Sequence, residues 1–91
     1  MTTNDKGQTY TGLILVTGQS SAEIKSKILE TLSPFSIKII DQQEMDIRNR
    51  YFLTILIALD RAHEKAISTD LENTAKGLGV DLAIDFSFYE I

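Results

Sequence analysis

The 91-residue sequence contains no cysteine and no tryptophan, and only one histidine and one proline. Without cysteine the chain forms no disulfide, no thiolate zinc site and no thiol nucleophile. His63 has no second metal-binding residue type at ligand spacing and no neighbouring nucleophile, so we interpret it as a solvated surface residue. The sequence therefore predicts no metal site, no cofactor and no catalytic residues.

Positive charge is also scarce. Nine Lys and Arg stand against 13 Asp and Glu, which gives a formal net charge of −4. Nucleic acids and anionic membranes are bound by clustered Lys and Arg, so neither is an expected partner. No apolar run approaches the roughly 18 residues of a membrane span, and the start of the chain lacks the apolar stretch of a signal peptide. These absences favour a cytoplasmic protein.

The length suits one domain with a thin core. Residues 1–9 carry almost no apolar side chain and are predicted to be a flexible leader, followed by one folded domain over residues 10–91.

Hydrophobic periodicity predicts four strands, over 10–17, 37–47, 51–59 and 80–88. The first strand, closed by Gly18, is expected to be buried on both faces. The second alternates with Ile37, Ile39, Met45 and Ile47 on one side, a parity that also turns Asp41 and Gln43 inward. A bulge that the sequence does not locate would change that parity.

Two amphipathic helices separate these strands. In the first, Ile24, Ile28 and Leu32 repeat every four residues before Pro34, and Ser20 with Glu23 forms a capping-box pattern. The second is capped by Asp60, continues through an apolar stripe and ends at Gly77 and Gly79. The turn between strands two and three is expected at 48–50.

The order βαββαβ predicts an α+β ferredoxin-like sandwich, with a four-stranded antiparallel sheet, two helices on one face and the first and third strands in the middle. Both faces of these middle strands are apolar, whereas the helices can cover only one. We therefore expect self-association through the uncovered face or by pairing of edge strands, which buries part of Leu53, Ile55 and Ile57 or their opposite neighbours.

Several segments together resemble an ACT domain, most narrowly the amino-terminal ACT region of bacterial phosphoserine phosphatases. They are the strand end Val16-Thr17-Gly18 with the hydrophobic helix after it, Ile39-Ile40-Asp41, Arg48-Asn49-Arg50 and Gly79-Val80-Asp81-Leu82. The similarity extends from Thr11 to Ser87. It implies a regulatory domain related to serine biosynthesis that binds an amino acid, with serine as the expected ligand, and pairs as a homodimer or with a second ACT domain. Phosphoserine hydrolysis belongs to a separate catalytic domain, so this chain alone is not expected to be an enzyme.

The resemblance places the ligand at the first loop, and the candidate binding residues are Gly18, Gln19, Ser20, Ser21 and Glu23. In that family the loop usually reads Asp-Arg-Pro-Gly, whereas this sequence has Ser20-Ser21-Ala22-Glu23. Glu23 sets an anion where a ligand carboxylate would lie, against the help of the helix dipole. Two alternatives stay open: a pairing module that has lost its ligand, and an acidic ferredoxin-like domain with unrelated protein partners.

Overall fold

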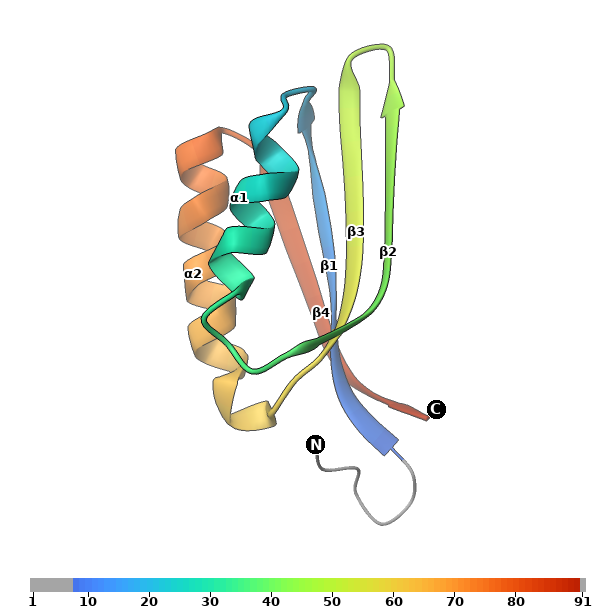
Figure 1. The fold of residues 1–91 in the computed structure, drawn as a ribbon, viewed down its shortest axis with the longest axis vertical. Coiled ribbons are helices and arrows are strands. Elements are labelled where there is room, and N and C mark those ends of the chain that lie inside the picture. The colour runs from blue at the N-terminus through green and yellow to red at the C-terminus, as the bar shows by residue number, and fades with distance from the viewer. Residues whose placement is uncertain (1–7, 91) are drawn as a thin grey trace.

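A computed structural model describes residues 8–90, which form a four-stranded antiparallel sheet with two helices on one face (Figure 1). Residues 1–7 of the predicted leader lie outside the described residues, whereas Gln8 and Thr9 are part of the first strand. The elements in chain order are β1 (Gln8–Gln19), α1 (Glu23–Leu32), β2 (Lys38–Ile47), β3 (Arg50–Ala58), the 3₁₀ turn η1 (Arg61–His63), α2 (Glu64–Leu78) and β4 (Asp81–Glu90). The sheet order β2-β3-β1-β4 confirms the predicted topology, with β1 and β3 in the middle.

The core lies between the helices and the sheet face that they cover, here called the inner face. Its fully buried side chains come from alternate positions of β1 and β3 and from the apolar stripes of both helices: Ile14, Val16, Leu53, Ile55, Ile57, Ile24, Ile28, Leu32, Ile67 and Leu71. Strand β4 adds Leu82, Ile84 and Phe86 at its edge. The apolar stripes of both helices are as predicted.

The opposite face of the sheet, here called the outer face, is not covered by the helices. Leu13 and Leu15 on this face are 46% and 40% exposed. The prediction that the first strand is buried on both faces is therefore wrong, because both helices pack on the same side. Leu53, Ile55 and Ile57 are 0% exposed within the chain, so the predicted self-association does not bury these three residues further.

A bulge at Ile40 interrupts the pairing of β2 with β3. Ile39 lies opposite Ile57, and the register then shifts so that Asp41 lies opposite Leu56. Since an extra residue inverts the parity of the strand, Met45 lies on the outer face, opposite Phe52. The prediction that Ile39 and Met45 share a face is wrong. Asp41 and Gln43 point outward rather than inward, and Glu44 and Asp46 turn toward the helices.

Two residues with positive φ connect β2 to β3. Arg48 and Asn49 have φ of 50° and 71°, which matches the backbone twist preferred by two-residue hairpins and confirms the predicted turn. The Ser20 amide donates to the Asn49 carbonyl over 2.8 Å. This hydrogen bond joins the end of β1 to the hairpin and brings the first loop beside β2.

The second helix begins with a short 3₁₀ turn. The Asp60 carboxylate accepts a hydrogen bond from the Ala62 amide at 2.8 Å, as expected of a cap. Gly79, with φ of 71°, ends the helix, whereas Gly77 lies inside it, contrary to prediction. His63 is half-buried beside Phe35, and its Nδ1 has no hydrogen-bond partner among residues 8–90, so the interpretation as a solvated residue is wrong. Neither helix in this part of the chain is long and apolar enough to cross a membrane.

Candidate functional site

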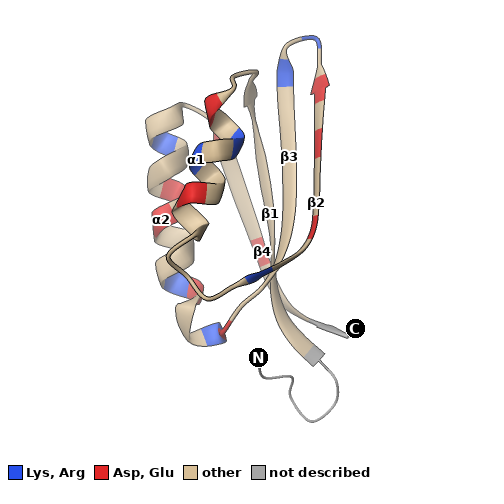
Figure 2. Cartoon of the chain, viewed as in Figure 1, with Lys and Arg blue, Asp and Glu red and all other residues tan. Residues whose placement is uncertain are grey.

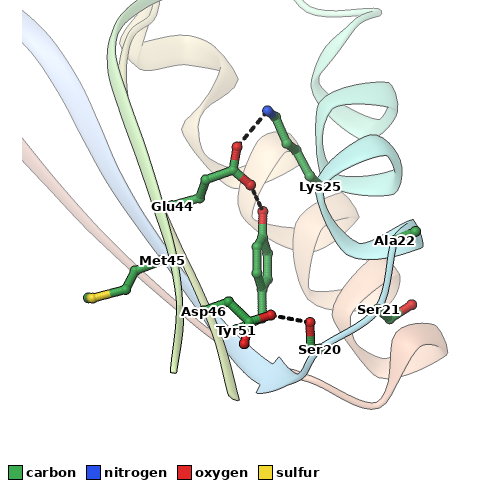
Figure 3. Close-up of a pocket in the computed structure, with 8 residues that line it drawn as sticks. All are labelled: Ser20, Ser21, Ala22, Lys25, Glu44, Met45, Asp46 and Tyr51. Atoms are coloured by element: carbon green, nitrogen blue, oxygen red, sulfur yellow. Dashed lines mark hydrogen bonds and ion pairs between the residues drawn. The ribbon is translucent and has the colours of Figure 1, made fainter. Parts of the chain in front are cut away.

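A hollow of about 520 Å³ lies between the start of α1 and the inner face of the edge strand β2. Its lining comes from the loop after β1, the first turn of α1, the end of β2 and the start of β3: Ser20, Ser21, Ala22, Lys25, Glu44, Met45, Asp46 and Tyr51. Figure 3 shows the side chains of Lys25, Glu44, Tyr51 and Asp46 converging, while Met45 points away from them. The polar groups of the hollow are thus held by four different elements.

Glu44 links the helix to the sheet. Its Oε2 accepts a hydrogen bond from Lys25 Nζ at 2.7 Å, and its Oε1 accepts one from the Tyr51 hydroxyl at 2.6 Å. These two donors, Lys25 first, hold the pKa of Glu44 below its ordinary value. Burial of the Tyr51 phenol, together with its hydrogen bond to Glu44, raises the pKa of Tyr51. Near neutral pH the hollow therefore contains the Glu44 carboxylate and a neutral Tyr51 phenol.

Ser20 and Asp46 form the second polar pair, in which the serine hydroxyl donates to the carboxylate Oδ2. The predicted capping box is wrong: α1 starts at Glu23 without a side-chain cap, and Ser20 is directed to β2 instead. The reason is the hydrogen bond of the Ser20 amide to the Asn49 carbonyl, which holds this residue beside the β2–β3 hairpin. Ser21 takes over locally, since its Oγ accepts from the Glu23 amide at 3.2 Å.

The residues predicted for ligand binding lie in different surroundings. Ser20 and Ser21 line the hollow. Gly18 is buried near the end of β1 beside Val80, and Gln19 is exposed opposite Arg50. Glu23 is exposed and does not line the hollow.

Lys25, Glu44, Asp46 and Tyr51 were missed by sequence reasoning. The alternation of acids around Met45 was a signal that Glu44 and Asp46 share a face. Which face they share depended on the bulge at Ile40, which the sequence did not locate.

The lining offers hydrogen-bond donors, acceptors and charges of both signs within one open hollow. Lys25 can attract an anionic group, whereas Glu44 and Asp46 can attract a cationic one. The hydroxyls of Ser20, Ser21 and Tyr51 can donate or accept. Within residues 8–90 no three His, Cys, Asp or Glu side chains are placed to hold a metal ion. This combination suits a small zwitterion.

Known structures share this fold at low sequence identity. Formyltetrahydrofolate deformylase from Burkholderia mallei is 14% identical over 84% of this chain, with a TM-score of 0.75, and this chain spans only 28% of it. An ACT domain protein from Streptococcus pneumoniae is 13% identical, with a TM-score of 0.75 and coverage of 86% of this chain and 90% of its own. For the regulatory subunit of aspartate kinase from Thermus thermophilus the identity is 11%, the TM-score 0.66 and the coverages 91% and 58%. Among curated proteins none matches.

The ACT domain family model matches residues 11–85. This match includes both helices, most of β1, all of β2 and β3, and the first half of β4. The chain belongs to the ACT domain family.

Proposed function

We propose that this regulatory domain binds a small amino acid in the hollow between the first loop and β2. The observation that carries the proposal is the placement of Lys25 and Asp46 in the lining of one hollow of about 520 Å³. Sites for small molecules commonly have volumes of roughly 300 to 1,000 Å³ and a few polar groups that fix the ligand's orientation.

The charges suggest how a zwitterion lies in the hollow. The Lys25 ammonium has three donors, so it can hold a ligand carboxylate while it keeps its hydrogen bond to Glu44. Asp46 uses Oδ2 to accept from Ser20, and its other oxygen can accept from a ligand ammonium. Glu23 does not oppose this orientation, because its side chain is exposed outside the lining. This placement supports a ligand-binding domain over one that has lost its ligand.

Titration calorimetry with the full chain tests the proposal. L-serine is the first ligand, as the resemblance to phosphoserine phosphatases predicts, followed by the other standard amino acids. Lys25→Met should weaken binding about tenfold or more, since it removes a charge-assisted hydrogen bond. Lys27→Met is the matched control, because Lys27 pairs with Glu30 on the same helix and does not line the hollow.

Each outcome of this titration is decisive. Binding that Lys25→Met weakens and Lys27→Met preserves supports the hollow as the site. The absence of heat with every amino acid contradicts the proposal, and equal affinity in both variants contradicts the location. A preference for an amino acid other than serine would support amino-acid binding in the hollow and contradict the narrower link to serine biosynthesis.

We also propose that two copies pair along β2. This strand lies at the edge of the sheet, and Ile39 and Ile40 on it are 42% and 38% exposed. An unpaired edge is a template for another strand. The hollow opens beside the same strand, so a second copy there would extend its walls.

Light scattering at increasing protein concentration tests this pairing. Ile40→Lys should dissociate the pair, since a charge on an edge strand opposes strand addition. Leu13→Ser, on the outer face, is the control and should leave the pair intact. A chain that stays monomeric up to millimolar concentration contradicts pairing, and dissociation by Leu13→Ser alone would move the interface to the outer face.

A further inference from the structure

The outer face carries an apolar strip along the two central strands. Phe52 and Leu56 of β3 and Leu13 and Leu15 of β1 project from this side, as their register shows. Both leucines of β1 are at least 40% exposed, and Met45 on the neighbouring β2 is 54% exposed. Within residues 8–90 no element covers this face, since both helices lie on the other side (Figure 1). An apolar area of this kind on one face of a domain commonly marks an interaction surface.

One cross-strand row of this face has an acid at each end. Asp41 of β2 lies opposite Leu56, Leu56 opposite Leu13, and Leu13 opposite Asp85 of β4. A second hollow, of about 300 Å³, opens here, lined by Leu13, Asp41, Gln42, Gln43, Thr54 and Leu56. The row therefore combines an apolar floor with carboxylates on both sides.

The two carboxylates of this row have no ion-pair partner in the part of the chain that the structure describes. Among residues 8–90, neither Asp41 nor Asp85 forms an ion pair, whereas Asp81 on the same face lies 3.7 Å from the Arg50 guanidinium. The Asp41 carboxylate accepts a hydrogen bond from the amide of its neighbour Gln42 at 2.8 Å. Lys38, at the start of β2, lies opposite Ala58. Figure 2 shows the acidic positions along β2.

The geometry points to an amphipathic helix of a partner protein, with an apolar stripe flanked on both sides by Lys or Arg, as the occupant of the outer face. Adjacent strands lie about 4.8 Å apart, so the three strand spacings between Asp41 and Asp85 separate them by roughly 14 Å. A helix with its side chains is about 10 to 12 Å wide and fits between these acids. Its apolar stripe would lie on Leu13 and Leu56, and its flanking cations would reach the two carboxylates.

A second copy of this chain fits the same face less well. Two copies could stack their outer faces about a two-fold axis. If this axis runs along the strands and through the row, Asp41 of one copy lies against Asp85 of the other. An axis across the strands sets Asp41 against Asp41. Either arrangement opposes carboxylates across a closing apolar interface, where charge is expensive to desolvate. A cation-flanked helix removes this repulsion.

Fluorescence anisotropy of the full chain with a labelled peptide tests the inference. The probe is a helix of about five turns with Leu and Ala along one stripe and Lys on both flanks. A second peptide has every Lys replaced by Glu. We expect the Lys peptide to bind, binding to weaken with added salt, and the Glu peptide not to bind.

Two double variants locate the contact. Asp41→Asn with Asp85→Asn keeps both side-chain shapes, and it should weaken the Lys peptide about tenfold, because two favourable charge pairs are lost. Asp70→Asn with Glu72→Gln removes the same charge from exposed positions of α2 and should change the affinity less than about twofold. The affinity of Leu13→Ser for the Lys peptide tests whether the apolar floor contributes to binding. A melting curve confirms that each variant is folded.

Three results would overturn the inference. The first is that the two double variants bind the Lys peptide with equal affinity. The peptide would then be attracted by the overall negative charge of the chain and not by Asp41 and Asp85. The second is binding of the Glu peptide as tightly as the Lys peptide. The third is a dimer of the unaltered chain that Leu13→Ser dissociates, which would make the outer face a contact between copies.

Discussion

Tyr51 donates its hydroxyl to Glu44 over 2.6 Å, although its ring belongs to the hydrophobic core. The two residues lie on the inner face of neighbouring strands, diagonally across the β2–β3 pair. One side chain thus packs in the core with its ring and reaches the candidate site with its oxygen. Stability and the charge state of the hollow are therefore coupled through this contact.

Tyr51→Phe should lower the free energy of unfolding by about 1 kcal/mol, because it removes one hydrogen bond and keeps the buried ring. It should also raise the pKa of Glu44 toward its ordinary value, since one of its two donors is lost. Urea denaturation and an NMR titration of the Glu44 carboxyl measure the two effects. Tyr10→Phe is the control: its hydroxyl donates to Glu64 near the start of α2, so it should alter stability alone. An unchanged Glu44 pKa in Tyr51→Phe would contradict the coupling.

Stability should fall in acid partly through Glu44. The folded pKa of this group lies below its ordinary value of 4.5, so its contribution is present above pH 4.5 and is lost as the pH falls through the folded pKa. The difference in unfolding free energy between the natural chain and Glu44→Gln should therefore shrink below pH 4.5. Lys25→Met should make the unfolding free energy fall less steeply in acid, because Lys25 is the main cause of the lowered pKa of Glu44. Denaturation curves from pH 3 to pH 7 test this, and parallel curves for all three proteins would contradict it.

The fold was predictable because its signals are local. The four-residue repeat of Ile24, Ile28 and Leu32 and the strict alternation of β4 each specify one element and its buried side. Arg48-Asn49 marks the hairpin in the same way. Once these elements are in order, the handedness of the crossovers leaves few topologies.

The candidate site was predictable only in part, because it depends on contacts far apart in the sequence. The bulge at Ile40 inverts the parity of β2, and no local pattern distinguishes it from continued alternation. The Ser20 hydroxyl has two possible partners, the start of α1 at Glu23 and the Asp46 carboxylate. The sequence favours Glu23, because it is nearer along the chain. The actual partner, Asp46, is brought close by the hairpin that holds the Ser20 amide.

Gly18→Ala should destabilise the domain by about 1 to 3 kcal/mol, the cost of overpacking a close contact. A Cβ at this position would lie 2.5 Å from Val80 Cγ1 and 3.0 Å from Val80 Cβ, so Val80, just before β4, must shift. Gly77→Ala is the matched control. Its Cβ would meet nothing within 4 Å, and the helix should gain about 0.5 to 1 kcal/mol. Thermal melts compare the two, and equal melting temperatures would contradict the close approach of β1 to Val80.

The substitution Glu23→Gly tests whether this residue contributes to the stability of α1, to ligand binding, or to both. Glu23 is the first residue of α1, its side chain is exposed, and its amide donates to the Ser21 hydroxyl. Glycine should cost about 0.5 to 1 kcal/mol through poor helix propensity and the loss of an acid near the positive end of the helix dipole. Glu23→Gln isolates the charge and should cost about 0.3 kcal/mol.

Neither substitution at Glu23 should change amino-acid affinity, because the side chain does not line the hollow. Ser20→Ala should do the reverse: it removes a hydroxyl that lines the hollow and orients Asp46, so it should weaken binding more than it lowers the melting temperature. Melting curves with and without L-serine on all three variants make the comparison. A serine-dependent shift that appears only in Glu23→Gly would mean that Glu23 occludes the site, and the ligand-free pairing module would then be the better description of the natural chain.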